Sequence, residues 1–199
     1  FTRTWFEQLR ADPAIAFIVP RTRTISATVR LRNSDANVRA NLTAELIPTA
    51  VGDPAIGSTV ATAPDSTHVV LSAQAGRKLK VAAGDTVQAI VTRTRNGRRE
   101  RVNLPLKVVG IASEQAFARA GLFAQVSLLE AVENYRDGLG VKQFSWPGAV
   151  PGNAAARQFA SYRLYAKTLA DVAPLRARLE AIGLNVSTRA NDIAVLQSL

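Results

Sequence analysis

Residues 86–109 read TVQAIVTRTRNGRRERVNLPLKVV, and this stretch carries the strongest structural signal of the chain. Two segments of alternating polarity flank Asn96-Gly97, a pair typical of a type I′ turn because both central residues of that turn need a positive φ. If Arg95 faces Arg98, the register predicts the pairs Arg93 with Glu100, Val91 with Val102, Ala89 with Leu104 and Val87 with Leu106. Each such pair contributes roughly 0.2–1 kcal/mol. The pattern therefore predicts a β-hairpin in a single register.

The hairpin follows a second informative segment, VVLSAQAGRKLKVAAGDTVQAIV at residues 69–91. Ser72 is placed to cap a two-turn helix over residues 73–79. Gly84 then supplies backbone freedom for a tight turn, and the Asp85 side chain supplies local hydrogen bonds. We therefore expect a strand, a short helix and a turn that leads into the hairpin.

The N-terminal part predicts one helix followed by two strands. Thr4 and Glu7 have the spacing of a capping box at the start of a helix over residues 5–11. A buried strand over 14–19 follows, and then an alternating strand over 23–31. One face of the latter strand carries Ile25, Ala27, Val29 and Leu31, and the other carries Thr24, Ser26, Thr28 and Arg30.

The C-terminal part predicts two further helices. Residues 125–138 form the first, with Ser127 and Glu130 at its start and Gly138 as its cap. A strand over 159–166, a helix opened by Thr168 and Asp171, and a strand over 183–188 form a strand–helix–strand unit. The predicted apolar faces are Leu128, Val132 and Tyr135 in the first helix and Leu169, Val172, Leu175, Leu179 and Ile182 in the second.

Two segments lack a clear period. Residues 33–68 hold one expected strand over 42–47 and are otherwise rich in Gly, Pro, Ser, Thr and Ala, and residues 141–155 are similar. We interpret both as extended loops.

Composition restricts the class of protein. The 199 residues are 47% apolar and 20% charged, as in an ordinary globular protein. The absence of Cys excludes disulfides and thiolate catalysis. The chain begins at Phe1 and has no Met, so we expect a processed chain or a segment of a longer one. The net charge of +10 is compatible with anionic partners or with simple solubility.

The sequence gives little support for catalysis. His68 is the single histidine, and we expect a surface or structural role for it. A nucleotide site is not expected, because no Gly-Lys pair occurs and the GLG at 138–140 lacks a third glycine. A carboxylate pair would suit a hydrolase, but turn positions explain the candidates Asp12, Asp53, Asp65 and Asp85. We predict no catalytic, cofactor or metal site.

One cluster of charge remains, TRTRNGRRER at residues 92–101. Its arginines are a possible interaction surface: Arg93, Arg95, Arg98, Arg99 and Arg101. The cluster fits a solvated hairpin tip, a surface for an anionic partner or lipid headgroup, or a nucleic-acid contact. No aromatic residues interleave with the arginines, which argues against binding of single-stranded nucleic acid.

The order of segments resembles a known family. Residues 69–91 are followed by LKVVGI at 106–111, AQVSLLEAVENY at 124–135 and YRLYAKTLADVAPLRARLEAIGLNVSTRANDI at 162–193. This succession is similar to the MacB-like periplasmic core domain of ABC transporter permeases of the FtsX-like and lipoprotein-releasing group. LRADPAIAFIVPRTR, at residues 9–23, resembles the opening of the same domain.

The resemblance implies a periplasmic domain held between two membrane helices of an inner-membrane permease. It implies no catalytic site, because a separate cytoplasmic ATPase would hydrolyse ATP. The domain would couple membrane-helix motion to export or membrane extraction of cargo, with a periplasmic protein or lipid-linked cargo as partner and no nucleic acid.

The implied fold is α+β. Residues 1–45 and 157–199 would form a mixed α/β subdomain, and residues 46–156 an inserted β-rich subdomain. Two alternatives remain. One is a free basic β-rich module that binds an acidic partner or nucleic acid, and the other is a hydrolase that uses His68 or an Asp pair.

Overall fold

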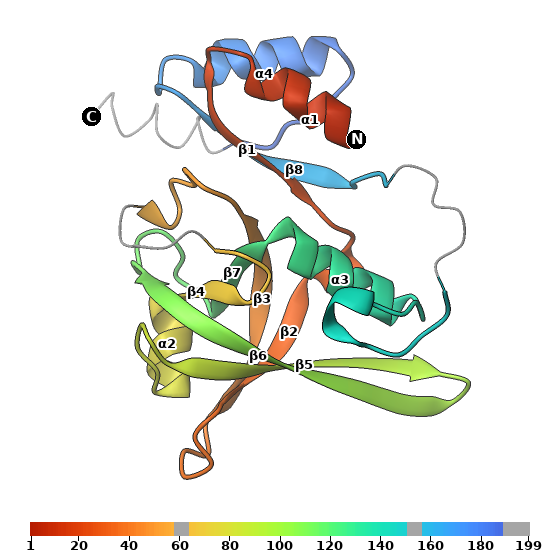
Figure 1. Ribbon diagram of the computed structural model, residues 1–199. Helices are drawn as coiled ribbons and strands as arrows, with labels where there is room; N and C mark the ends of the chain where they lie inside the picture. The colour runs from red at the N-terminus through yellow and green to blue at the C-terminus, as the bar shows by residue number, and fades with distance from the viewer. Residues whose placement is uncertain (58–63, 151–156, 189–199) are drawn as a thin grey trace.

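The computed structural model describes residues 1–57, 64–150 and 157–188, and it has an α+β fold (Figure 1). The strands are β1 Ile15–Arg21, β2 Thr28–Asn33, β3 Asn41–Thr49, β4 His68–Ser72, β5 Thr86–Arg95, β6 Arg98–Ala112, β7 Gly121–Gln125 and β8 Ser161–Ala166. The helices are α1 Arg3–Arg10, α2 Ala73–Leu79, α3 Val126–Arg136 and α4 Val172–Ala181, with short 3-10 turns η1 Thr24–Ser26 and η3 Lys142–Phe144.

Six strands close into a barrel in the order β2-β3-β7-β4-β6-β5. The pairs β3–β7 and β4–β6 are parallel, whereas β5 pairs antiparallel with both β2 and β6. Closure leaves no unpaired sheet edge along the barrel wall. The barrel is therefore a stable frame on which outward-facing side chains have set positions.

The barrel core combines strand residues with residues of two helices. Its fully buried members include Leu31, Leu106 and Leu122 from the strands. Leu79 of α2 and Leu129 of α3 belong to the same apolar cluster. Burying each such side chain contributes roughly 1.5–3 kcal/mol, so both helices are integral to the barrel.

The two ends of the chain form a second, smaller part. β1 pairs antiparallel with β8, and α1 and α4 lie together beside this pair at the top of Figure 1. Phe6, Ile18 and Phe159 form an apolar cluster separate from the barrel core. The amino group of Phe1 donates a hydrogen bond of 3.0 Å to the carbonyl oxygen of Phe159. We call the set α1, β1, β8 and α4 the end subdomain.

The structure confirms the hairpin and the segment before it. Every predicted cross-strand pair is present, from Arg95 with Arg98 to Val87 with Leu106, and φ is 49° at Asn96 and 72° at Gly97. Ser72 caps α2.

The turn before the hairpin is confirmed as well. Gly84 has a φ of 98°. The carboxylate of Asp85 accepts a hydrogen bond of 2.8 Å from the Ala82 amide. Gly84-Asp85 is therefore a structural turn.

Other local predictions are wrong. Thr2, not Thr4, caps α1, and its side chain accepts from the Trp5 amide. Residues 24–26 form η1 and not a strand, because the chain bends there as it passes from the end subdomain to the barrel. Ile25 is consequently 42% exposed. No strand is present at 184–188 in the described part of the C-terminal segment.

The strand pairing also moves the predicted boundary at residue 45. Both β2 and β3 are barrel strands, and a division at residue 45 would cut through β3. The first crossing into the barrel lies instead between Arg21 and Thr28, around η1. The reason is long-range: β2 pairs with β5, which alternation within residues 23–31 does not reveal.

Candidate anion-binding groove

The two faces of the β5–β6 hairpin carry different arginines. Side chains alternate along a strand, so Arg93 shares the buried face with Val91. Arg99 and Arg101 are exposed, and Arg101 is paired with Thr92 on the other face. The hairpin therefore separates the predicted arginine cluster into an inner and an outer set.

Arg93 is not a surface residue, and this corrects its predicted role in an interaction surface. Its side chain is only 2% exposed. It donates to Glu100 at 2.6 Å and to the carbonyl oxygens of Tyr135 and Pro147 at 2.9 Å each. Its guanidinium also lies 4.0 Å from the centroid of the Tyr135 ring. Arg93 fastens the hairpin to α3 and to the loop that follows α3.

A hollow of about 1090 Å³ lies over the outer face of β2, β5 and β6, and we call it the basic groove. Residues 34–40, which join β2 to β3, line one end of it. Six arginines line the groove: Arg30, Arg32, Arg39, Arg99, Arg101 and Arg136. Of the predicted cluster, Arg99 and Arg101 thus belong to the groove, whereas Arg95 and Arg98 lie at the hairpin tip.

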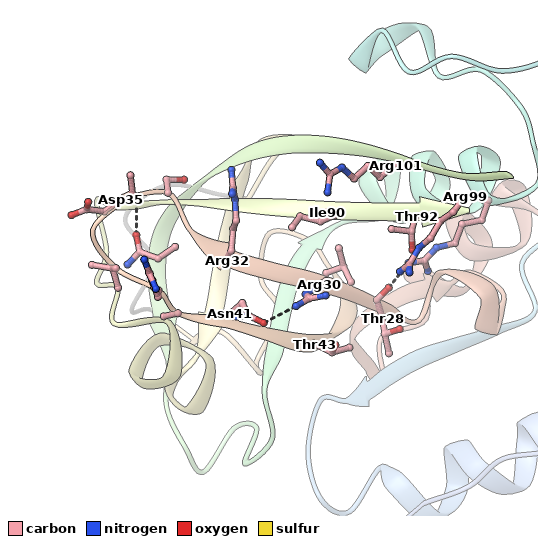
Figure 2. A pocket seen from close by; sticks show the side chains of 18 residues that line it. Thr28, Arg30, Arg32, Asp35, Asn41, Thr43, Ile90, Thr92, Arg99 and Arg101 are labelled. Carbon is pink, nitrogen blue, oxygen red and sulfur yellow. Dashed lines mark hydrogen bonds between the residues drawn. The ribbon is translucent and has the colours of Figure 1, made fainter. Parts of the chain in front are cut away.

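The strand register explains how distant arginines meet. Arg30 of β2 is paired with Ile90 of β5, and Thr92, two residues further along β5, is paired with Arg101 of β6. Arg30 and Arg101 therefore stand on opposite sides of β5. Figure 2 shows the arginines of β2 and β6 with Ile90 and Thr92 between them.

The positive charge of the groove has almost no compensating negative charge. Asp35 is the single acid among its described lining residues, and its carboxylate accepts from the backbone amide of Asn37 at 2.8 Å. Within the part of the chain that the structure describes, none of the six arginines forms an ion pair with a carboxylate. Such a concentration of one sign attracts anions.

Two groove side chains are held in place by neutral partners. Arg30 donates to the amide oxygen of Asn41 at 3.0 Å. Arg136, from α3, donates to the carbonyl oxygen of Thr28 at 2.9 Å and also to that of Ile25. Burial lowers the pKa of the Arg136 guanidinium. These contacts leave the positive charges of Arg30 and Arg136 uncompensated.

Sequence reasoning missed four of these arginines, which lie outside residues 92–101: Arg30, Arg32, Arg39 and Arg136. A partial signal existed, because Arg30 belongs to the polar face of the segment 23–31. The pairing of β2 with β5 is what brings that face beside the hairpin.

His68 forms a local contact at the start of β4. Its Nδ1 atom lies 2.8 Å from one carboxylate oxygen of Asp65, and the other carboxylate oxygen accepts from the backbone amides of Thr67 and His68. Desolvation raises the pKa of Asp65, but the hydrogen bonds from Thr67 and His68 outweigh it and lower that pKa to about 2. Asp65 and His68 therefore stabilise the turn at residues 65–68, which leads into β4.

The other turn aspartates each accept a hydrogen bond in their own turn, and they do not form a carboxylate pair. Asp12 accepts from the Ala14 amide at 2.9 Å, and Asp53 accepts from Thr49 at 2.6 Å. Asp85 holds the turn before β5. Each of these carboxylates thus has a local structural partner.

Residues 1–57, 64–150 and 157–188 contain no cluster of metal-ligating side chains, because no three side chains of His, Asp or Glu gather there as ligands for a metal ion.

No helix in those same ranges combines the length and the apolar character that a bilayer crossing requires.

A scan against protein-family models finds no match to this chain, and a search of curated proteins finds no significant match.

Proposed function

We propose that the chain is a non-catalytic periplasmic domain of an ABC-type permease in the inner membrane. It couples motion of membrane helices to export or extraction of cargo, or to a periplasmic partner, while a separate cytoplasmic ATPase hydrolyses ATP. The supporting observation is the division into an end subdomain and a closed barrel. A domain inserted into a longer chain is entered and left through one part of its structure, and the end subdomain has that character.

A buried ion pair links the end subdomain to the barrel. Arg163 of β8 donates to one carboxylate oxygen of Asp53 at 2.9 Å, contacts the other, and donates to the Pro48 carbonyl of β3 at 2.8 Å. The Asp53 side chain is fully buried. Burial acts to lower the pKa of Arg163, but the hydrogen bond and charge of Asp53 raise it. This contact favours joint motion of the two parts.

A second link ties both crossing segments to α3. Glu133 of α3 accepts from the Arg23 side chain at 3.0 Å and from Arg157 at 2.9 Å. Arg23 lies between β1 and β2, and Arg157 lies before β8. Force applied to the end subdomain would thus reach the barrel through oriented charge-assisted bonds.

The DNA that flanks the coding segment provides the first test. We expect a hydrophobic stretch of about 20 residues before Phe1 and another after Leu199, with an ATPase gene nearby. The absence of both stretches would overturn the proposal.

Accessibility in cells provides a second test. These 199 residues contain no cysteine, so an Asn96→Cys substitution at the exposed hairpin tip introduces a specific label site once any cysteines elsewhere in the parent protein are replaced by serine. A maleimide that does not cross the inner membrane should label it in the parent protein. Ala124→Cys is the matched control, because Ala124 is 0% exposed and should remain unlabelled. Labelling of Asn96→Cys only after lysis of the inner membrane would contradict the proposed location.

The unpaired arginines favour a second candidate, a free basic module for an acidic macromolecule. Arg98 and Arg99 are exposed near the tip. This candidate predicts strongly salt-dependent binding that is lost when both become Glu. Binding of neither DNA nor an acidic protein at low salt would eliminate it.

A further inference from the structure

We propose that the basic groove is a binding site for a ligand that carries two or more phosphoryl groups. This inference goes beyond the transport role and does not depend on it, because it rests on the groove alone. Six arginines from β2, β6, α3 and the β2–β3 connection meet there. Arginine presents a planar fork of donors that matches phosphate oxygens in a bidentate geometry.

The groove differs from the rest of the arginine surface. Of the thirteen arginines elsewhere in the described ranges, ten lie within 4.0 Å of a carboxylate and Arg10, Arg95 and Arg98 do not, whereas all six groove arginines lack such a partner. Like charges held together are unfavourable for the compact state. A bound polyanion would supply the missing counter-charge.

The strand geometry defines a first binding position, or seat, for a phosphoryl group between Arg30 and Arg101. Arg30 and Arg101 stand on the two sides of β5, and neighbouring strands are about 4.8 Å apart. Their Cα rows are therefore about 10 Å apart, a span that two long side chains can close from both sides. Thr92 of β5, which is paired with Arg101, adds a hydroxyl donor beside this seat. Figure 2 shows these three residues on one face of the sheet.

Further seats follow along the groove. Arg99 and Arg136 lie at the η1 end, and Arg136 is already oriented by its bonds to Ile25 and Thr28. Arg32 and Arg39 lie toward the β2–β3 connection. Arg32 lies four positions after Thr28 in β2, which corresponds to about 14 Å along the strand. The groove can thus engage more than one phosphoryl group at once.

The lining argues against larger partners. Among the described lining residues none is aromatic, so bases of a single-stranded nucleic acid would have no stacking surface. Apolar lining is restricted to small or single side chains such as Ile90 and Val38, whereas protein interfaces have an apolar core. The volume of about 1090 Å³ lies just above the range for small-molecule sites, about 300–1,000 Å³.

Calorimetric titration of the purified chain with tripolyphosphate tests the proposal. Binding should be measurable at low salt and weaker at high salt. Arg30→Gln and Arg101→Gln should each weaken it by about tenfold or more, as loss of a charge-assisted bond implies. Thr92→Val, which changes no charge, should weaken it by a smaller factor. Thermal unfolding of each variant checks that the fold is retained.

Two matched controls separate a built site from general attraction. Arg10→Gln in α1 and Arg98→Gln at the hairpin tip remove the same charge at exposed arginines outside the groove lining. Both should leave the affinity within about twofold of the wild type. Equal weakening in the controls and in the groove variants would overturn the proposal, as would equal affinity for citrate or no binding of tripolyphosphate.

Vesicles identify the source of the phosphoryl group. If cardiolipin, which carries two phosphoryl groups, binds in phosphatidylcholine vesicles and tripolyphosphate displaces it, the ligand is a lipid headgroup. If tripolyphosphate binds and the vesicles do not, the ligand is soluble. Either result supports the phosphoryl site, whereas vesicle binding that persists in Arg30→Gln and Arg101→Gln would contradict it.

Discussion

The two faces of the β5–β6 hairpin use arginine in opposite ways. On the inner face, Arg93 is buried, paired with Glu100 and bonded to backbone carbonyls of α3 and the following loop. On the outer face, Arg99 and Arg101 are exposed and line a groove without carboxylate partners. The residues are neighbours in sequence and differ in the side of the sheet from which they project.

Burial changes what an arginine side chain contributes to the protein. A buried charge must be compensated, and removing its partner or the charge itself is costly. An exposed charge interacts weakly with its surroundings because water and salt screen it. A buried arginine should therefore affect stability, and the exposed arginines of the groove should affect binding.

The largest effect is expected for Arg93→Met. The substitution leaves Glu100 without its partner and removes the charged donor from the carbonyl oxygens of Tyr135 and Pro147, so we expect a loss of about 2–4 kcal/mol in the free energy of unfolding. Urea denaturation measures it. Arg95→Met is the matched control, because Arg95 is on the same strand but exposed, and it should change stability by less than about 0.5 kcal/mol. Equal effects at the two positions would contradict the claim that the buried arginine contributes more to stability than the exposed one.

Gly148→Ala perturbs the inner side without changing charge. A Cβ at Gly148 would overlap the backbone of Leu139 and Gly140, and it would displace the neighbouring Pro147 carbonyl that accepts from Arg93. We expect a loss of about 1–3 kcal/mol, measured by thermal or urea unfolding. At Gly140 an added Cβ meets backbone atoms at 3.4 Å. Gly140→Ala should therefore have a clearly smaller effect.

The pH dependence of stability should show how little the exposed contact between Asp65 and His68 contributes. Its pKa is lowered from 3.8 to about 2 in the folded chain, so its contribution is complete above about pH 4 and is lost as pH falls through about 2. Because the side chain is 52% exposed, the contribution should be below about 1 kcal/mol. Asp65→Asn should be less stable than the wild type at pH 6 and equally stable at about pH 1, below the pKa of Asp65 in the folded chain. An undiminished difference at the lower pH would contradict this assignment.

The smallest effect is expected for Arg101→Ala. Removing one unpaired charge from the basic groove should leave the free energy of unfolding within about 0.5 kcal/mol or raise it slightly at low salt. High salt should abolish the difference, because the screening length shortens to a few ångströms at about 1 M salt. A loss of more than about 1 kcal/mol would mean that Arg101 stabilises the fold and is not free for a ligand.

Prediction from sequence succeeded where the signal is local. The Asn96-Gly97 turn specifies the hairpin register, and Ser72, Gly84 and Asp85 specify a cap and a turn. It failed at residues 24–26 and 184–188, where alternation resembled a strand. Alternation identifies a possible face but not a pairing partner, and a strand requires a partner.

The sequence by itself determined the α+β character, the hairpin with its register, and the excess of arginine over acid. Local turn chemistry, side-chain alternation and composition are sufficient for these features. The tertiary structure decided which arginines are buried and which share the groove. Pairing of β2 with β5 places Arg30 across β5 from Arg101, which is 71 positions away in the sequence. Such a contact depends on closure of the barrel, which no local segment encodes.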